Sequence, residues 1–235
     1  MKYLGGKMRI AKQIGSYLNQ VIEDKRITGY IEPMCGSCWI TQEINPNIKR
    51  FASDIHPDLI LLWKGLQDGS FTPPDTVSEE QYKILKETPP SALRGFVGFG
   101  CSFSGKWWGG YARCKTKPRN YCGEAKRTLL KKIQKLRNVN FSCCSYDFWY
   151  PRDTLIYCDI PYFGTTEYKD KFNYENFYNW SRVMSRNNYL YISEYKMPDD
   201  FETVLEIHTK TDMSNKDGKK EHRIEKLFRH KDGLK

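Results

Sequence analysis

Residues 154–162 read TLIYCDIPY, a short apolar run that passes directly into an aspartate and then a proline. The length of the run and its β-branched and aromatic residues predict a strand, the clearest one in the chain. Pro161 stiffens the turn that follows, because its ring fixes the backbone. The stretch therefore predicts that Asp159 stands at the carboxyl end of a strand, with Tyr162 in the loop beyond it.

The segments before this strand alternate between short strands and helices. Residues 7–25 carry apolar side chains at helical spacing, and residues 30–32 form a short strand that is followed by a turn and a helix to about Ile44. Residues 51–54 give a second strand, and Pro57 opens the next helix, where its missing N–H does no harm. This alternation predicts a parallel sheet.

The pattern breaks after Gly65 and resumes at residue 139. Ser78 and Gln81 predict a capping box at the start of a helix, whereas residues 95–123 show no sustained period and are expected to form loops or a hairpin. A basic helix then leads to a strand at residues 139–143. We expect a further helix, strand and antiparallel hairpin, in sequence order, at the ranges 173–186, 189–193 and 204–228.

These elements predict an α/β fold whose sheet is mostly parallel and ends in an antiparallel hairpin. Residues 1–65 and 138–235 would form one domain, and residues 66–137 an inserted subdomain. The length of 235 residues suffices for one sizeable core with such an insertion.

Positive charge is concentrated in the insertion. The chain carries 38 Lys and Arg against 28 Asp and Glu, a net charge of +10, and residues 106–137 alone hold eleven basic residues and one acid. Tryptophans and glycines are interleaved with these charges. Basic side chains beside aromatic rings are typical of nucleic-acid binding, although the charge alone fits a solvated helix face equally well.

The eight cysteines predict no metal site. Cys35 and Cys38 have C-x-x-C spacing, but neither a second pair nor a well-placed histidine completes a tetrahedral ligand set. No apolar run reaches the roughly 18–20 residues that span a bilayer, and the amino-terminal residues lack the apolar core of a signal peptide. We expect a cytoplasmic protein that binds neither metal nor membrane.

Three acids stand at the carboxyl ends of predicted parallel strands, namely Glu32, Asp54 and Asp159. This edge is where open α/β sheets bind ligands, and a carboxylate there can accept hydrogen bonds from a ribose diol. Acids at strand ends also commonly cap the next helix, so the position alone leaves both interpretations open. The glycine fingerprint of dinucleotide enzymes and the phosphate loop of ATPases are both absent, which favours a cofactor without phosphates.

Asp159-Ile160-Pro161-Tyr162 resembles the (D/N/S)-P-P-(Y/F) motif of amino-group DNA methyltransferases. Four further segments follow the order found in the Dam-like, alpha-group adenine methyltransferases: YLGGK at 3–7, IEPMCGS at 31–37, SDIHPDL at 53–59 and YDF at 146–148. The chain is thus similar to a small phage-type member of that family over nearly its whole length apart from residues 66–95. Ile160 replaces the usual first proline, and Cys38 and Trp39 stand where the family commonly has small residues.

The resemblance implies a Rossmann-like methyltransferase sheet that uses S-adenosyl-L-methionine. Asp54 would bind the cofactor ribose, and Lys7 would anchor the opposite end. The residues that the resemblance assigns to the cofactor are Tyr3, Gly6, Lys7, Glu32, Pro33, Met34, Cys35, Gly36, Ser37, Asp54, Ile55, Asp147, Phe148 and Asp159.

The same resemblance assigns the chemistry to Asp159, Ile160, Pro161 and Tyr162. The amino nitrogen of adenine is a poor nucleophile, because its lone pair is delocalised into the ring. Acceptors aimed at its two N–H bonds, namely the Asp159 carboxylate and the Ile160 carbonyl, would help it to accept a methyl group. Tyr162 would stack on the base, which must first be flipped out of the duplex.

The insertion is expected to bind double-stranded DNA and to recognise the target sequence. The residues assigned to DNA are Lys106, Trp107, Trp108, Arg113, Lys115 and Arg119, and the chain is expected to be monomeric. Two alternatives stay open. A DNA-binding decoy or regulator would keep the basic insertion without transferring methyl groups, and an enzyme acting on RNA adenine or cytosine N4 could use the same motif.

Overall fold

The computed structural model describes residues 1–235 except 2, 115–118, 163–171 and 215–219. Its helices are α1 (Ala11–Asp24), α2 (Pro57–Asp68), α3 (Glu79–Lys86), α4 (Ala92–Gly100), α5 (Tyr121–Ile133) and α6 (Tyr174–Ser185), with 3-10 turns at Thr41–Glu43, Phe103–Gly105 and Tyr146–Phe148. Its strands are β1 (Gly29–Glu32), β2 (Lys49–Asp54), β3 (Val139–Cys143), β4 (Leu155–Asp159), β5 (Tyr189–Glu194), β6 (Phe201–Ser214) and β7 (Lys220–His230).

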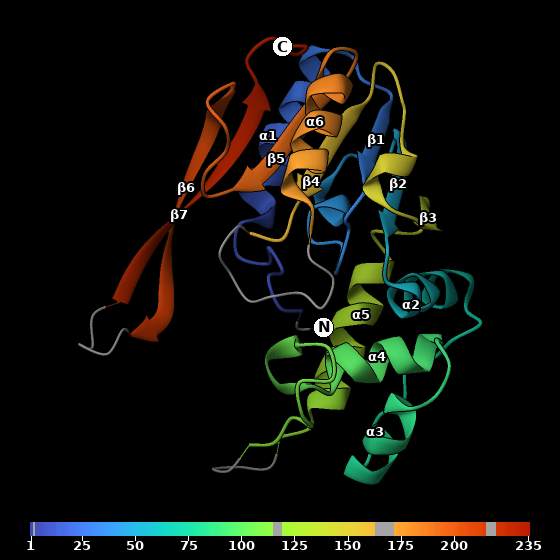
Figure 1. The fold of residues 1–235 in the computed structure, drawn as a ribbon. Helices are drawn as coiled ribbons and strands as arrows, with labels where there is room; N and C mark the ends of the chain where they lie inside the picture. Colours follow the sequence, from blue (N-terminus) through green and yellow to red (C-terminus); the bar gives the residue numbers. More distant parts are fainter. Residues whose placement is uncertain (2, 115–118, 163–171, 215–219) are drawn as a thin grey trace.

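The described strands form one seven-stranded sheet in the order β3-β2-β1-β4-β5-β7-β6. The five strands from β3 to β5 are parallel, whereas β7 runs antiparallel to both β5 and β6. The expected α/β fold with a mostly parallel sheet and an antiparallel hairpin at its carboxyl-terminal end is thereby confirmed (Figure 1).

Strand β4 lies in the middle of the sheet and is buried on both faces. Leu155 and Tyr157 pack with the apolar side of α1, while Ile156 and Cys158 pack with α6 on the other face. Successive side chains of a strand point to opposite faces, so only a continuous apolar run satisfies both layers. This packing explains why residues 154–158 were the clearest strand in the sequence.

Helices α3, α4 and α5 lie beyond the carboxyl edge of the parallel strands (Figure 1). They do not have a core of their own, because side chains of α4 and α5 share one buried cluster with α2 and with Ala52 and Phe141 of the sheet. The amino-terminal residues run between the two layers. Met1 is buried in that cluster, and the Tyr3 ring lies 4.9 Å from the Phe99 ring of α4.

Residues 92–100 form helix α4, so the expectation of irregular structure from residue 95 onwards is wrong there. The glycines that suggested a loop are sites of close packing. A Cβ on Gly95 would lie 2.3 Å from the backbone oxygen of Asp58 in α2, and one on Gly98 would lie 2.2 Å from the Trp107 ring. Tertiary contacts that only glycine permits outweigh its poor helix propensity.

The helix expected to run to Ile44 is also wrong, since only the short 3-10 turn Thr41–Glu43 forms. Gly36 and Cys38 both adopt positive φ angles, +45° and +54°, which no α-helix contains. The capping box is confirmed, because the Ser78 hydroxyl accepts from the Gln81 N–H and the Gln81 side chain accepts from the Ser78 N–H. Within the described part of the chain, no helix is long and apolar enough to cross a membrane.

Candidate active site at the carboxyl edge of the sheet

Asp159 and Lys7 form an ion pair at the end of β4. The Lys7 Nζ lies 2.7 Å from the Asp159 Oδ1, and the two side chains are 7% and 21% exposed. Burial raises the pKa of the Asp159 carboxyl above its ordinary value, and the adjacent Lys7 ammonium opposes that rise. The sequence suggested a cofactor role for Lys7, whereas the structure brings its charge onto the candidate catalytic carboxylate.

Tyr162 stands beside this ion pair in a cluster of aromatic and acidic side chains. Its ring centroid is 4.2 Å from the Lys7 Nζ, and its hydroxyl donates to the Glu225 Oε2 of β7 at 2.6 Å. The Tyr195 hydroxyl donates to the other oxygen of Glu225 at 3.4 Å, and the two tyrosine rings meet edge to face at 4.5 Å. Burial raises the pKa of Tyr162 well above its ordinary value, so its hydroxyl stays protonated.

Ile160 and Pro161 join this cluster to the core. The Ile160 side chain is 2% exposed and packs with Phe177 of α6, while the Pro161 carbonyl accepts a hydrogen bond from the Tyr174 hydroxyl at 2.9 Å. An isoleucine in place of proline therefore fills an apolar pocket under the turn.

The predicted amino-terminal segment and the loop after β1 lie against one another. A Cβ on Gly36 would lie 3.0 Å from the Tyr3 ring, and one on Gly6 would lie 3.2 Å from both the Ser37 Oγ and the Trp39 ring. Asp54 at the end of β2 holds the same loop, since its Oδ2 accepts from the Gly36 N–H at 3.0 Å and its Oδ1 accepts from the His56 N–H at 2.9 Å. Two segments far apart in sequence thus form one surface.

Two apolar side chains are exposed beside Asp54. Ile55 follows β2 and is 65% exposed, and Phe148 in the turn after the neighbouring strand β3 is 67% exposed. Asp147 next to it is also exposed. Strands β2 and β3 pair in parallel up to Asp54 and Cys143, so both side chains follow the ends of adjacent strands. Exposed apolar side chains at a ligand-binding edge can flank a flat ring.

Four other residues of the predicted cofactor loop shape the loop from within. Pro33, Cys35 and Ser37 are buried and Met34 is half-buried. The Pro33 carbonyl accepts from the Ser53 hydroxyl, and the Cys35 N–H donates to the Ser53 carbonyl at 2.8 Å. In the ranges that the structure describes, no three His, Cys, Asp or Glu side chains come together as a metal site would require.

Glu32 lies inside the protein and does not face the open edge. Its side chain is 2% exposed, and its Oε2 accepts hydrogen bonds from the Thr41 N–H at 2.9 Å, from the Thr41 hydroxyl and from the Tyr30 hydroxyl at 3.0 Å. Burial raises the pKa of Glu32 to about 8, although these hydrogen bonds oppose the rise. Glu32 therefore fixes the far end of the loop that contains Gly36.

Glu32→Gln should remove a pH dependence of stability. The pKa of about 8 in the folded protein lies above the ordinary value of 4.5, so the folded state is favoured while Glu32 is protonated, and this stabilisation is lost as the pH rises towards 8. Glutamine keeps an acceptor for Thr41 and Tyr30 but does not ionise. The free energy of unfolding should therefore fall less in the variant than in the wild type between about pH 5 and pH 9.

Urea unfolding at several pH values measures this difference. Glu23→Gln, on the exposed side of α1, is the matched control and should follow the wild type. Parallel pH curves for wild type and Glu32→Gln would show that Glu32 does not titrate in this range.

Among the residues predicted to contact DNA, the two tryptophans are packed against other rings and the two arginines form ion pairs. Trp107 and Trp108 are half-buried; Trp107 lies 4.6 Å from Phe99 and Trp108 lies 4.7 Å from Tyr82, measured between ring centroids. Lys106 is exposed. Arg113 pairs with Glu79, Arg119 pairs with Glu124 at 2.7 Å, and Lys115 lies outside the described residues.

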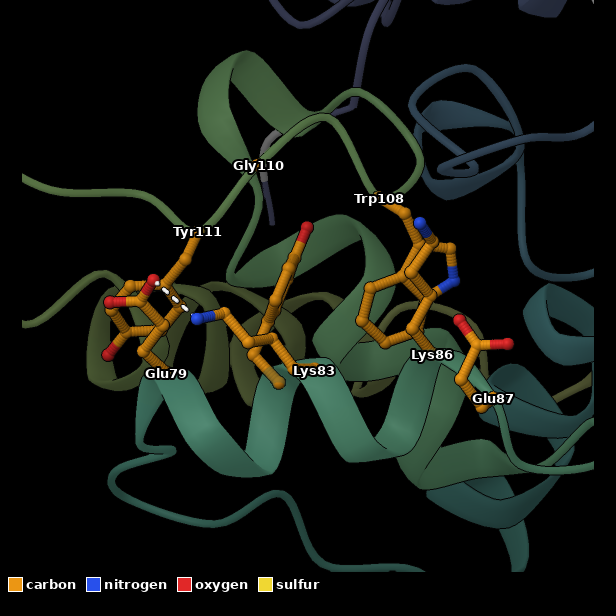
Figure 2. Close-up of a pocket in the computed structure, with 8 residues that line it drawn as sticks. Glu79, Lys83, Lys86, Glu87, Trp108, Gly110 and Tyr111 are labelled. Carbon is orange, nitrogen blue, oxygen red and sulfur yellow. Dashed lines mark ion pairs between the residues drawn. The ribbon is translucent and has the colours of Figure 1, made fainter.

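A pocket of about 380 Å³ lies between α3 and the turn that contains Trp108. Figure 2 shows the side chains that line it. Lys83 and Lys86 line it together with Glu79 and Glu87, and Lys83 pairs with Glu79 at 3.4 Å. Its positive and negative side chains balance, so this pocket has no surplus charge for a phosphate.

Sequence reasoning missed the roles of Glu225 and Tyr195. Both lie in the carboxyl-terminal part of the chain, and no pattern in the sequence indicates that they meet at Tyr162. Their contact depends on how β7 aligns with β5, where Ser193 pairs with Leu227 and Glu194 with Lys226.

The amino-terminal part of the chain is similar to a known family. The family model described as D12 class N6 adenine-specific DNA methyltransferase matches residues 3–90, which include Lys7, the loop after β1 and Asp54. No curated protein matches the chain. The matched segments and the mostly parallel sheet agree with each other, and residues 3–90 of the chain are similar to the D12 class of N6 adenine-specific DNA methyltransferases.

Proposed function

We propose that the chain transfers the methyl group of S-adenosylmethionine to N6 of an adenine that is flipped out of duplex DNA. The observation that carries this proposal is the cluster of Asp159, Lys7 and Tyr162 at the carboxyl edge of the sheet. It supplies a charged acceptor and an aromatic ring at one place, and Gly6, next to Lys7, lies against the loop that follows β1.

The surface around Asp54 fits the nucleoside part of the cofactor. The Asp54 oxygens each accept one backbone N–H, and a carboxylate oxygen has a second lone pair for a ribose hydroxyl. Ile55 follows the end of β2 and Phe148 follows the end of β3; both are exposed and would contact the adenine ring, with Asp147 next to Phe148. When bound, S-adenosylmethionine supplies an activated methyl group on a sulfonium sulfur.

Asp159 is proposed to accept a hydrogen bond from the target amino group. Lys7 occupies its Oδ1 and favours the ionised carboxylate, which leaves the Oδ2 as an acceptor. Together, this oxygen and the Ile160 carbonyl would accept hydrogen bonds from the two N–H groups of the adenine amino group and so localise the nitrogen lone pair. The effect is electrostatic preorganisation, in which the enzyme stabilises the charge that develops on the nitrogen during transfer.

Tyr162 is proposed to stack on the flipped base. Its hydroxyl is fixed by Glu225 and its ring by Tyr195, so the ring is held in one orientation before DNA arrives. A base within a duplex cannot reach Asp159 at the sheet edge, and extrusion costs a few kcal/mol. Stacking on a preorganised ring offsets part of that cost.

Residues 66–137 are proposed to hold the duplex while the base is extruded. They include α3, α4 and α5, which lie beyond the edge that carries Asp159 (Figure 1). A separate DNA-holding layer in this position would bring the duplex to the mouth of the site.

One experiment tests the proposed reaction. The protein is incubated with methyl-labelled S-adenosylmethionine and duplex DNA, and the DNA is digested to nucleosides for identification. N6-methyladenine in DNA is the expected product. Product in RNA alone, or N4-methylcytosine, would contradict the proposal. Absence of both product and cofactor binding would favour a DNA-binding regulator.

A further inference from the structure

The outward face of α5 carries cations that pair with no acid among the described residues. Arg127 and Lys131 are exposed and form no salt bridge with a described side chain. Lys135, one turn further on, pairs with Glu43 at 3.1 Å but remains 53% exposed. The spacing of four residues places all three on one stripe of the helix and its carboxyl-terminal extension. At 1.5 Å per residue the stripe is about 12 Å long.

This stripe forms one wall of an open groove of about 490 Å³. The opposite wall is the segment after the β1 loop, including Trp39 and Gln42. Lys132 connects the two walls. It is 4% exposed, its Nζ lies 3.3 Å from the Trp39 ring centroid, and it donates to the Ser37 carbonyl. Glu124 also lines the groove, where it pairs with Arg119.

The groove adjoins the candidate active site. The Trp39 ring that forms its wall lies 3.2 Å from the Cβ position of Gly6, one residue before Lys7. The same loop contains Gly36, whose N–H donates to Asp54. A strand of nucleic acid lying along α5 would therefore run past the entrance to the site.

We propose that the groove between α5 and Trp39 binds the phosphodiester backbone of the substrate DNA next to the target adenine, through Arg127, Lys131 and Lys135. The occupant is duplex DNA because the surface is cationic and the enzyme class acts on DNA. Phosphates of one strand repeat every 3.4 Å along the duplex axis, so a stripe of about 12 Å spans three to four of them. The Trp39 ring adds a flat surface beside the charges.

This assignment deepens the proposed function and rests on it. It also assigns the contact with the DNA backbone to α5 instead of the turn at residues 106–113. In that turn the tryptophans are packed and Arg113 is paired. Binding at α5 is coupled to the cofactor loop through Lys132, since the helix that holds the phosphates also holds Ser37.

Arg127→Ala with Lys131→Ala tests the groove. Affinity for one duplex is measured over a series of salt concentrations for this double variant and the wild type. Each lost phosphate contact should make the slope of log affinity against log salt shallower by about 0.9, so the variant should lose about 1.8 in slope and bind about 60-fold more weakly at 0.1 M salt. Binding of S-adenosylmethionine and the melting temperature should stay as in the wild type.

The matched control removes two charges from the opposite edge of the sheet. Lys25 follows α1 and Lys49 begins β2; both are exposed. Lys25→Ala with Lys49→Ala should leave the slope close to that of the wild type.

An unchanged slope in the Arg127 and Lys131 variant, with methyl transfer by the wild type intact, would overturn the groove assignment alone. A shallower slope in that variant, with no methyl transfer by the wild type, would support the groove and contradict the proposed reaction.

Discussion

Asp159→Ala should reduce methyl transfer to duplex DNA by about 10²- to 10³-fold or more, because the reaction loses the charged acceptor for the adenine amino group. DNA binding should remain largely intact, since the proposed DNA contacts of α5 do not involve this side chain. Asp159→Asn keeps an acceptor oxygen but not the charge, so it should fall between the wild type and alanine. Initial rates with labelled cofactor, together with DNA affinity, measure both properties.

The control for Asp159 is another acid of the chain. Asp199 is exposed in the loop between β5 and β6, and Asp199→Ala should transfer methyl groups at the wild-type rate. Asp159→Ala also leaves the buried Lys7 ammonium without its partner, so the melting temperature of each variant must be compared. A folded Asp159→Ala protein that kept wild-type activity would exclude the proposed mechanism.

Lys7→Met should lower activity at neutral pH by about 10²-fold and move the acid limb of the pH profile to higher pH. Lys7 opposes the rise that burial causes in the pKa of Asp159, so removing the ammonium raises this pKa further. The proposed mechanism needs the ionised carboxylate, and that form is lost as the pH falls through the pKa. Activity in the variant should therefore recover more fully as the pH increases.

The pH dependence of kcat/KM separates two roles for Lys7. If Lys7 acts on Asp159, the limb shifts and the affinity for S-adenosylmethionine, measured by calorimetry, stays close to the wild type. If Lys7 instead anchors the cofactor, as the sequence resemblance implied, affinity falls and the acid limb stays in place. The ion pair at 2.7 Å favours the first result.

The strands that carry the site could be predicted because each depends on local pattern. β4 is a continuous apolar run between two helical layers, and β1 and β2 end in acids before turns. Burial on both faces leaves few alternatives for such runs. The order β-α-β-α then determines which strand ends share an edge.

The elements that could not be predicted depend on contacts between distant segments. α4 contains three glycines, and its helical form requires the close approach of Asp58 and Trp107. Trp107 and Trp108, which together with basic residues suggested a nucleic-acid platform, pack against aromatic rings of α3 and α4. Composition indicates that a segment is basic and aromatic, but not which side chains remain exposed.

The sequence predicts the edge of the sheet at which the candidate site lies, but it does not predict where the side chains at that edge point. All three acids stand at strand ends, yet Glu32 is buried with Thr41 and Tyr30 whereas Asp54 holds the Gly36 turn. The direction of each side chain depends on the loop that follows its strand. The partner of Lys7 is likewise set by the approach of the amino-terminal segment to β4, which is 148 or more residues away in sequence.

The contact of Glu225 with Tyr162 makes the hairpin part of the candidate active site. Tyr162 and Glu225 are 63 residues apart, and contacts between distant residues form late in folding because a long loop must first close. Strand β7 pairs with β5 over only a short stretch, from Ile192–Phe228 to Glu194–Lys226. If β7 separated from β5, Tyr162 and Tyr195 would lose their contacts with Glu225 while the five parallel strands stayed paired. Heat or denaturant should therefore abolish activity before it unfolds the parallel part of the sheet.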